Sequence, residues 1–242
     1  MTPMRGHVLV VEDVTAAALA LLARVLQEAR GAKVAVALSG GSTPLEMFDQ
    51  LGAPEARRQW PWHQLELFWG DERPVPPDHP DSNYGQARRR WLDRVPVPPG
   101  QVHPWPLLHN LSPDEAARQY AAALSAVLGP RPTMDLTWLG VGPEGHTASL
   151  FPGSPALTQA GWTAAPYVAS KGSARLTLTP AALNLSRRVV FLARGPDKAA
   201  IVRQAFADPA AGLPVQAIAP AADPWWILDR AAAAGLPAFP GA

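Results

Sequence analysis

The chain has 242 residues, of which 48% are hydrophobic and 17% charged, and its formal net charge is +1. This composition excludes disordered and collagen-like chains and predicts one sizeable core in a single domain, residues 1–242. A charge so close to neutral gives no reason to expect nucleic acid or a membrane surface as a partner. The absence of cysteine excludes disulfides, thiolate catalysis and cysteine-ligated metals.

The first apolar run, residues 16–23, does not have the pattern of a secretory signal. It follows Glu12 and Asp13 and is followed by Arg24, so the basic lead and the cleavage signal are both missing. We therefore expect a cytoplasmic protein. Its oligomeric state is unknown from the sequence.

Strands alternate with helices from the start of the chain. Residues 7–11 read as a strand, and Asp13 is placed to cap a helix that runs to about Arg30. Residues 33–38 form a short apolar run typical of a buried parallel strand. Pro44 then fits the first turn of a second helix.

The turn between that strand and helix is a candidate anion site. Backbone N–H groups at a helix N-terminus attract phosphate, and hydroxyl groups stand beside them here. The residues are Ser39, Gly40, Gly41, Ser42 and Thr43. The same turn, taken alone, fits an ordinary Gly/Ser/Pro connection equally well.

The next strand, residues 65–69, ends in a second polar group. Arg73 could hold a phosphate or a carboxylate with two hydrogen bonds, and Asp71 could accept from sugar hydroxyls or orient an imidazole. For Glu72 we favour a surface turn with weak ion pairing. Ser82 is expected to cap a helix whose arginines, residues 88–90 and 94, form a solvated face.

The remaining elements continue the alternation. Ser112, Pro113 and Glu115 predict a capped helix that runs to about Leu128, with Glu115 closing a capping box. Further strands are expected at 102–105, 134–139, 163–169, 175–179, 188–193 and 225–229, with a helix from about 198 to 207 and a frayed tail at 240–242. Trp60, Trp62, Trp105, Trp225 and Trp226 are expected in the core or in an interface. The pattern predicts an α/β fold with a mostly parallel sheet flanked by helices.

The strand at 134–139 leads into the glycine-rich stretch 140–153, which contains His146. Ligands bind at the carboxyl ends of parallel strands, so this histidine is expected at a crevice. Gly140, Gly142 and Gly145 lack a Cβ, so the backbone there can take positive φ and bring its N–H groups close to a bound oxygen, and the N–H groups from Gly142 to His146 could stabilise an oxyanion. An imidazole, with an ordinary pKa of about 6.5, can act as a general base near neutral pH.

Two more cations are candidates for binding an anion. Arg175 and Thr177 share a face of their predicted strand, and Lys198 falls in the first turn of a helix, where it needs a compensating anion. A solvated surface lysine is the plain alternative for Lys198. Base-assisted attack of water on a carbonyl needs no metal and no cofactor, and His103 and His109 show no metal-ligand spacing with His146.

Six motifs, in order along nearly the whole chain, closely resemble the 6-phosphogluconolactonase family. They are the segments 39–44, 71–73, 82–84, 145–152, 175–179 and 195–198. The resemblance implies a Rossmann-like domain that hydrolyses 6-phosphogluconolactone in the pentose phosphate pathway, with His146 as catalytic base. It implies substrate binding by the 39–44 turn, Arg73, Asn83, Arg175 and Lys198, and the substrate, a phosphorylated sugar lactone, is the expected partner.

One departure from the family pattern is Glu144, where the family usually has aspartate: the carboxylate that could position His146 or water is kept, but its reach grows by a methylene. The related glucosamine-6-phosphate deaminases carry an acidic residue after their histidine, where this chain has Leu150, Phe151 and Pro152. We rank a deaminase second for this reason. A sugar-phosphate-binding regulator without turnover is the third alternative.

Overall fold

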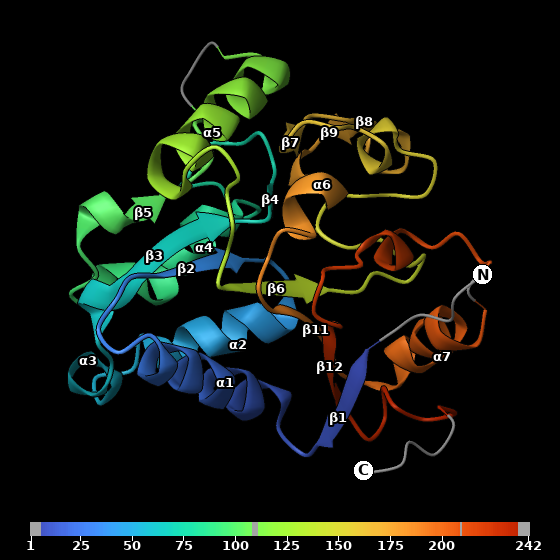
Figure 1. The fold of residues 1–242 in the computed structure, drawn as a ribbon, viewed down its shortest axis with the longest axis horizontal. Helices are drawn as coiled ribbons and strands as arrows, with labels where there is room; N and C mark the ends of the chain where they lie inside the picture. The colour runs from blue at the N-terminus through green and yellow to red at the C-terminus, as the bar shows by residue number, and fades with distance from the viewer. Residues whose placement is uncertain (1–5, 108–110, 209, 237–242) are drawn as a thin grey trace.

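A parallel sheet of seven strands forms the centre of the molecule, which is a computed structural model that describes residues 6–107, 111–208 and 210–236. The spatial order is β1-β12-β11-β6-β2-β3-β5, and all neighbouring pairs are parallel (Figure 1). The strands are β1 (His7–Val11), β2 (Val34–Leu38), β3 (Leu65–Trp69), β5 (Val102–His103), β6 (Leu136–Gly140), β11 (Val189–Ala193) and β12 (Trp225–Asp229). The predicted α/β fold is thereby confirmed.

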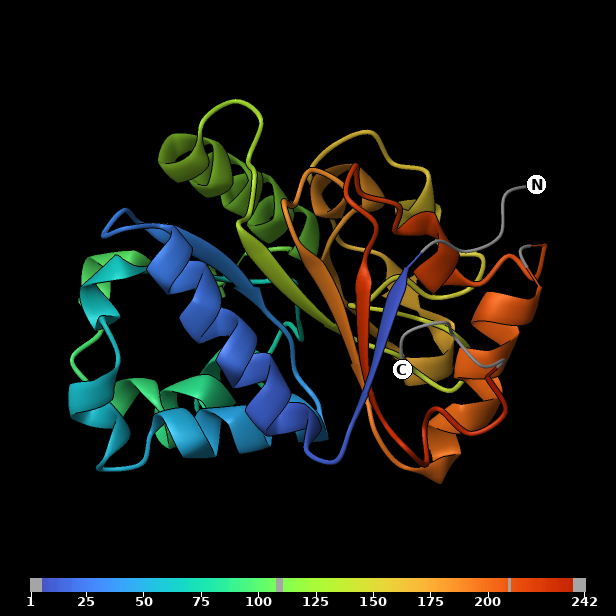
Figure 2. The same ribbon diagram turned by 60° about the horizontal axis from the view of Figure 1, so that its bottom comes forward.

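Helices cover both faces of this sheet. They are α1 (Val14–Glu28), α2 (Ser42–Leu51), α3 (Ala56–Gln59), α4 (Asn83–Arg90), α5 (Pro113–Leu128), α6 (Pro180–Leu183) and α7 (Ala199–Ala207). The chain first crosses the sheet from β1 to β5, and the connections of this half contain α1 to α4. It then returns from β5 to β12, and the connections of this half contain α5 to α7. Right-handed crossovers place these two sets on opposite faces. In Figure 2, α1 and α2 lie on one side of the sheet and α7 on the other.

A small antiparallel sheet lies beside the main one and corrects one predicted strand. It joins β4 (Asp71–Glu72), β10 (Leu176–Leu178) and β7 (Thr163–Ala164), while β8 (Tyr167–Val168) pairs with β9 (Ser173–Ala174). The single strand predicted at 163–169 is wrong, because it is divided into β7 and β8. Pro166 lies between them and has no N–H group to extend either ladder.

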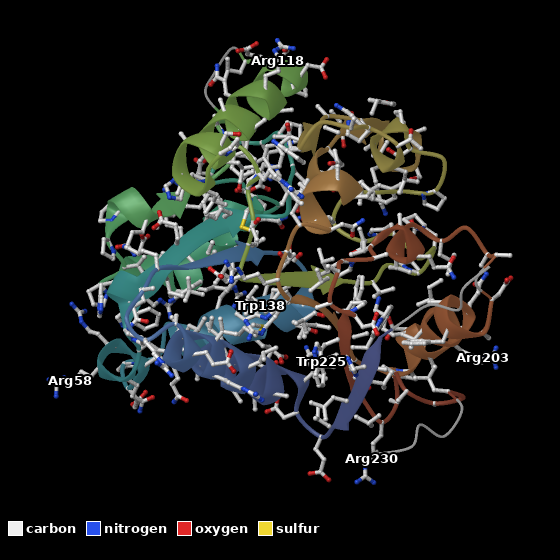
Figure 3. All side chains as sticks on the ribbon, in the orientation of Figure 1. Arg58, Arg118, Trp138, Arg203, Trp225 and Arg230 are labelled. Carbon is white, nitrogen blue, oxygen red and sulfur yellow. The ribbon has the colours of Figure 1, made fainter. Side chains whose placement is uncertain are left out.

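The core lies between the sheet and its helices. Trp138, on β6, is 1% exposed and lies inside the molecule, whereas Arg58, Arg118, Arg203 and Arg230 lie at its periphery (Figure 3). The tryptophans at 62, 105 and 226 are buried as predicted. Trp225 is 41% exposed, because it faces outward at the start of β12 beside the edge strand β1.

The predicted helix starts are confirmed. The side chains of Asp13, Ser82 and Ser112 accept from the backbone N–H groups of residues 16, 85 and 115. Two details differ. The carboxylate of Glu115 accepts hydrogen bonds from Arg118 and Gln119 instead of closing a capping box. Arg94 lies in a separate 3₁₀ turn, because α4 ends before the buried Trp91. The predicted tail at 240–242 lies outside the described residues.

The two loops singled out in the sequence meet where the direction of the chain across the sheet reverses. β2 and β6 are neighbours, but the chain continues from β2 to β3 on one side and from β6 to β11 on the other. Such a reversal opens a crevice at the carboxyl ends of the two strands. The 39–44 turn follows β2, and the 140–153 stretch follows β6. Within the described ranges, no helix has the length and apolar character needed to cross a membrane.

Candidate active site

A pocket of about 280 Å³ opens at this crevice, at the carboxyl ends of β11, β6, β2 and β3. It brings together eleven of the predicted site residues from four separate loops. They are Ser39, Gly40, Gly41, Ser42, Thr43, Asp71, Arg73, Asn83, Gly142, His146 and Lys198. Glu144, Gly145 and Arg175 do not line it. The parallel sheet therefore does what the sequence pattern predicts: it collects polar strand ends at one edge.

His146 contacts a carboxylate inside its own loop. Its Nδ1 lies 3.0 Å from Oε2 of Glu144 in an ion-pair contact, and neither of these buried atoms has an aligned hydrogen-bond partner among the described residues. Burial raises the pKa of Glu144, but bonds from its own N–H and from the imidazole, with the charges of His146 and Lys171, bring it below the ordinary value. An ionised Glu144 favours a proton on Nδ1, which leaves Nε2 as the basic nitrogen towards the pocket.

The glycines of the histidine loop have different conformations and different contacts. Among Gly140, Gly142 and Gly145, only Gly145 has a positive φ, of 76°. Gly142 is required for a steric reason, since a Cβ there would lie 2.0 Å from Cε1 and Nδ1 of His146. The N–H groups of Gly142 and Gly145 bond the carbonyls of His146 and Gly142 at 2.8 and 3.0 Å. Both donors are used within the loop, so the predicted oxyanion role of these two N–H groups is not supported.

The 39–44 turn has the geometry of an anion site. Gly41 precedes α2 with φ of 106° and offers no side-chain cap, so the first N–H groups of the helix are left for a ligand. The hydroxyl of Ser39 is used differently from the others: it donates to the carbonyl of Trp138 at 2.8 Å and ties β2 to β6. Ser42 and Thr43, which begin the helix, supply the hydroxyls at the pocket.

Asn83 links the turn after β2 to the residues after β3. A Cβ on Gly40 would lie 2.0 Å from Oδ1 of Asn83, so glycine makes room for this amide. Oδ1 accepts a short hydrogen bond from Arg73, and Nδ2 donates to the carbonyl of Asp71 at 2.9 Å. The amide thereby fixes the position of the Arg73 guanidinium at the wall of the pocket.

Asp71 is 7% exposed, and both of its carboxylate oxygens have protein partners. Oδ2 accepts from the hydroxyl of Ser149 at 2.7 Å, and Oδ1 lies 3.3 Å from Nδ2 of Asn83. Of the two roles considered for Asp71, orienting the imidazole does not match these contacts, because the carboxylate beside His146 is that of Glu144. A contact with sugar hydroxyls remains open to it, since it lines the pocket.

Glu72 is not a surface turn, and that interpretation was wrong. Its side chain is fully buried and accepts the N–H groups of Arg73, Asn83 and Tyr84, each at 2.8 Å, and the hydroxyl of Ser82 at 3.1 Å. Burial raises its pKa against the lowering effect of those backbone bonds. The carboxylate thus joins β4 to the N-terminus of α4 and holds the segments that present Arg73 and Asn83.

Arg175 lies beside the pocket rather than in it. Its guanidinium donates to the carbonyl of Ala174 at 2.9 Å and to the hydroxyl of Ser173. Burial lowers its pKa, and the positive charge of Arg73 lowers it further. Two neighbouring guanidinium groups repel each other, so an anion between them would relieve that repulsion. Its predicted substrate contact stays a prediction.

Two cations border the pocket after β11, and only one of them was predicted. Lys198 lies in a 3₁₀ turn just before α7, and its Nζ is 3.3 Å from the Asp197 carboxylate, the compensating anion expected there. The second cation is Arg194, whose guanidinium binds both carboxylate oxygens of Glu46 on α2. This bond raises the pKa of Arg194. Its position directly after a predicted strand was the signal that could have identified it.

The histidines outside the site have other surroundings. His103 bonds the Glu66 carboxylate and stacks on Phe68 at a centroid distance of 4.7 Å. His109 lies outside the described residues. Within the part of the chain that the structure describes, no three His, Asp or Glu side chains are grouped to hold a metal ion.

Comparison with known proteins identifies the family. The family model for glucosamine-6-phosphate isomerases/6-phosphogluconolactonase matches residues 10–226. A 6-phosphogluconolactonase of Synechocystis is 40% identical over 207 residues, which are 83% of this chain and 84% of the relative. One from Mycobacterium tuberculosis is 39% identical over 222 residues, 86% of this chain and 87% of the relative.

Solved structures agree with these relatives. The 6-phosphogluconolactonase of Trypanosoma cruzi superposes with a TM-score of 0.84 at 26% identity, over 97% of this chain and 98% of that one. A monomeric glucosamine-6-phosphate deaminase gives a TM-score of 0.80 at 19% identity, covering 94% and 98% of the two chains, and shows the fold alone. The chain belongs to the glucosamine-6-phosphate isomerase/6-phosphogluconolactonase family.

Proposed function

We propose that the chain hydrolyses 6-phospho-D-glucono-1,5-lactone to 6-phosphogluconate, with His146 as the general base. The observation that carries this proposal is the buried contact of 3.0 Å between Nδ1 of His146 and Glu144, which leaves Nε2 to the pocket. The relatives that match over most of the chain are named 6-phosphogluconolactonase and support the same activity.

The phosphate of the substrate is proposed to bind at the start of α2. The N–H groups of its first turn carry the positive end of the helix dipole, and the hydroxyls of Ser42 and Thr43 add donors. Lys198 supplies a positive charge from the β11 side of the pocket, and Arg73 supplies one from the β3 side. We keep Arg175 as an outer contact that would join them when the anion is bound.

The lactone carbonyl would then lie at His146. Nε2 takes a proton from a water molecule while the water oxygen bonds to C1, and the carbonyl oxygen becomes an oxyanion. When this intermediate collapses, the bond from C1 to the ring oxygen breaks, and the imidazolium returns its proton to that oxygen. Glu144 stabilises the imidazolium in between, and Asp71 binds sugar hydroxyls. Remote binding of the phosphate provides the orientation for this step.

The segment after the histidine separates this proposal from deamination. A deaminase carries an acidic residue there, whereas Phe151 in this chain stacks on the His146 ring at 4.3 Å between centroids. An aromatic ring cannot transfer the additional proton that ring opening of an amino sugar needs. A phosphorylated sugar does not cross a membrane unaided, so the enzyme would work where its substrate is made, which we propose is the cytoplasm.

The test is acid release from freshly generated 6-phosphogluconolactone, corrected for spontaneous hydrolysis. We expect the purified chain to accelerate it strongly and to release no ammonia from glucosamine 6-phosphate. Ammonia release without lactone hydrolysis would establish the deaminase instead. Binding of 6-phosphogluconate without turnover of either substrate would indicate a regulator.

A further inference from the structure

The burial of Phe151 is not explained by the main hydrophobic core. Its side chain is 8% exposed, yet it does not belong to the cluster of buried residues that fills the space around the sheet. Its ring instead stacks against the imidazole of His146, with centroids 4.3 Å apart and an angle of 24° between the planes. The close neighbour of this phenylalanine is therefore the proposed catalytic base.

The backbone of Gly142 approaches the same imidazole. A Cβ built on Gly142 would lie 2.0 Å from Cε1 and Nδ1 and 2.7 Å from Nε2 of His146. The ring of His146 is thus enclosed by two contacts, one with backbone and one with an aromatic face. On the aromatic side, Nζ of the exposed Lys171 lies over the Phe151 ring, 5.9 Å from the centroid.

An enclosed ring matters because the terminal torsion of histidine is soft. The χ2 angle has broad, roughly two-fold minima, so a free imidazole turns and exchanges the positions of its two nitrogens. Only one of these positions places Nδ1 on Glu144 and Nε2 in the pocket. A stacked aromatic face opposes that rotation, and it also stabilises the imidazolium that forms when the base accepts a proton.

We propose that Phe151 is a positioning residue for His146: its ring holds the imidazole with Nδ1 on Glu144 and Nε2 towards the lactone. The inference rests on the proposed function for the reaction itself. The orientation of the ring is a property of the free protein and can be measured without substrate.

The test compares Phe151→Leu and Phe151→Met, which remove the ring, with Phe151→Tyr, which keeps it. The ring of Phe151 should shift the carbon-bound imidazole protons of His146 upfield in NMR spectra, and a His146→Gln variant assigns those signals. We expect the shift to disappear in the Leu and Met variants and to persist in the Tyr variant. With the lactone as substrate, kcat should fall about 10- to 100-fold in the Leu and Met variants, while KM stays within about twofold of wild type. The Tyr variant should have nearly the kcat of the wild type.

Phe191→Leu is the matched control. Phe191 stacks on Trp226 with the same centroid distance of 4.3 Å and an angle of 26°, but it does not contact the site. This variant should lose stability yet keep the His146 signals and kcat. Loss of the ring-current shift with unchanged kcat would overturn the proposal, and so would His146 signals that do not respond to Phe151. If the wild type lacks lactonase activity while the NMR shift is present, the proposed function is wrong, but the stacking of Phe151 on His146 is confirmed.

Discussion

Oε2 of Glu144 lies 3.0 Å from Nδ1 of His146, and the two residues are separated by a single glycine, Gly145, with a φ of 76°. The left-handed turn at Gly145 brings the carboxylate back onto the imidazole. A short loop thereby contains both the proposed base and the carboxylate proposed to orient it.

Replacing Glu144 with glutamine should lower kcat about 10- to 100-fold, because the imidazolium loses its neighbouring charge. The lowered pKa of Glu144 means that the carboxylate is ionised at every pH above its ordinary value of 4.5 and is lost only below it. Unchanged kcat in Glu144→Gln would exclude Glu144 from this role, and Glu144→Asp should retain more activity than glutamine.

Alanine at Gly142 should abolish most of the activity. The new Cβ would overlap the His146 ring at 2.0 Å, so the ring must move away from its position. Gly100→Ala is the control, because a Cβ there meets nothing within 4 Å and Gly100 does not line the pocket. We expect a loss of at least about 100-fold in kcat for the first variant and almost none for the second. Equal activity of the two variants would contradict the placement of the imidazole.

The buried carboxylate of Glu72 should contribute to stability and to the geometry of Arg73. In Glu72→Gln, an amide NH₂ replaces one carboxylate oxygen and faces two groups that are themselves hydrogen-bond donors. The free energy of unfolding should therefore fall by about 1–3 kcal/mol. The KM for the lactone should rise because Arg73 and Asn83 lose their support. Urea unfolding and initial rates measure both effects, with Glu55→Gln, at an exposed position, as control. Wild-type stability and KM in Glu72→Gln would refute the role.

The raised pKa of Glu72 adds a pH dependence to this comparison. Because the folded protein holds the proton more tightly than the unfolded chain, the stability from this group is present below the ordinary value of 4.5 and is lost as the pH rises towards the raised pKa. The stability advantage of wild type over Glu72→Gln should therefore shrink as the pH increases through that window. An advantage that grows with pH would mean that the folded protein lowers the pKa of Glu72 instead of raising it.

Lys198→Met should raise KM about 10- to 100-fold and change kcat little, since a fixed phosphate is bound equally in the ground and transition states. Lys33→Met is the control, because Lys33 pairs with Glu66 near the opposite end of β2, far from the pocket. Initial rates over a range of lactone concentrations separate the two constants. A fall in kcat at unchanged KM would place Lys198 at the reacting carbonyl.

The fold and the position of the site could be predicted from the sequence because both depend on local patterns. Alternating strands and helices specify a parallel sheet, and the polar residues after each strand must then meet at one edge. Which carboxylate contacts the histidine could not be predicted. That choice depends on whether Asp71 is occupied by Ser149, a residue 78 positions away in the chain.

Two further features depend on tertiary contacts that no motif shows. Asp-Glu-Arg has the composition of a surface turn, and only the packing of α4 over β4 buries Glu72. The predicted oxyanion donors, Gly142 and Gly145, close hydrogen bonds within their loop, which a one-dimensional pattern of glycines does not reveal.

The most direct test of the central claim is the rate of 6-phosphogluconolactone hydrolysis by His146→Ala, measured beside the binding of 6-phosphogluconate to the same variant. We predict that kcat falls about 10²- to 10⁴-fold while the dissociation constant of 6-phosphogluconate stays near that of the wild type, because the phosphate contacts lie elsewhere in the pocket. Wild-type turnover in His146→Ala would contradict the assignment of this residue as the catalytic base.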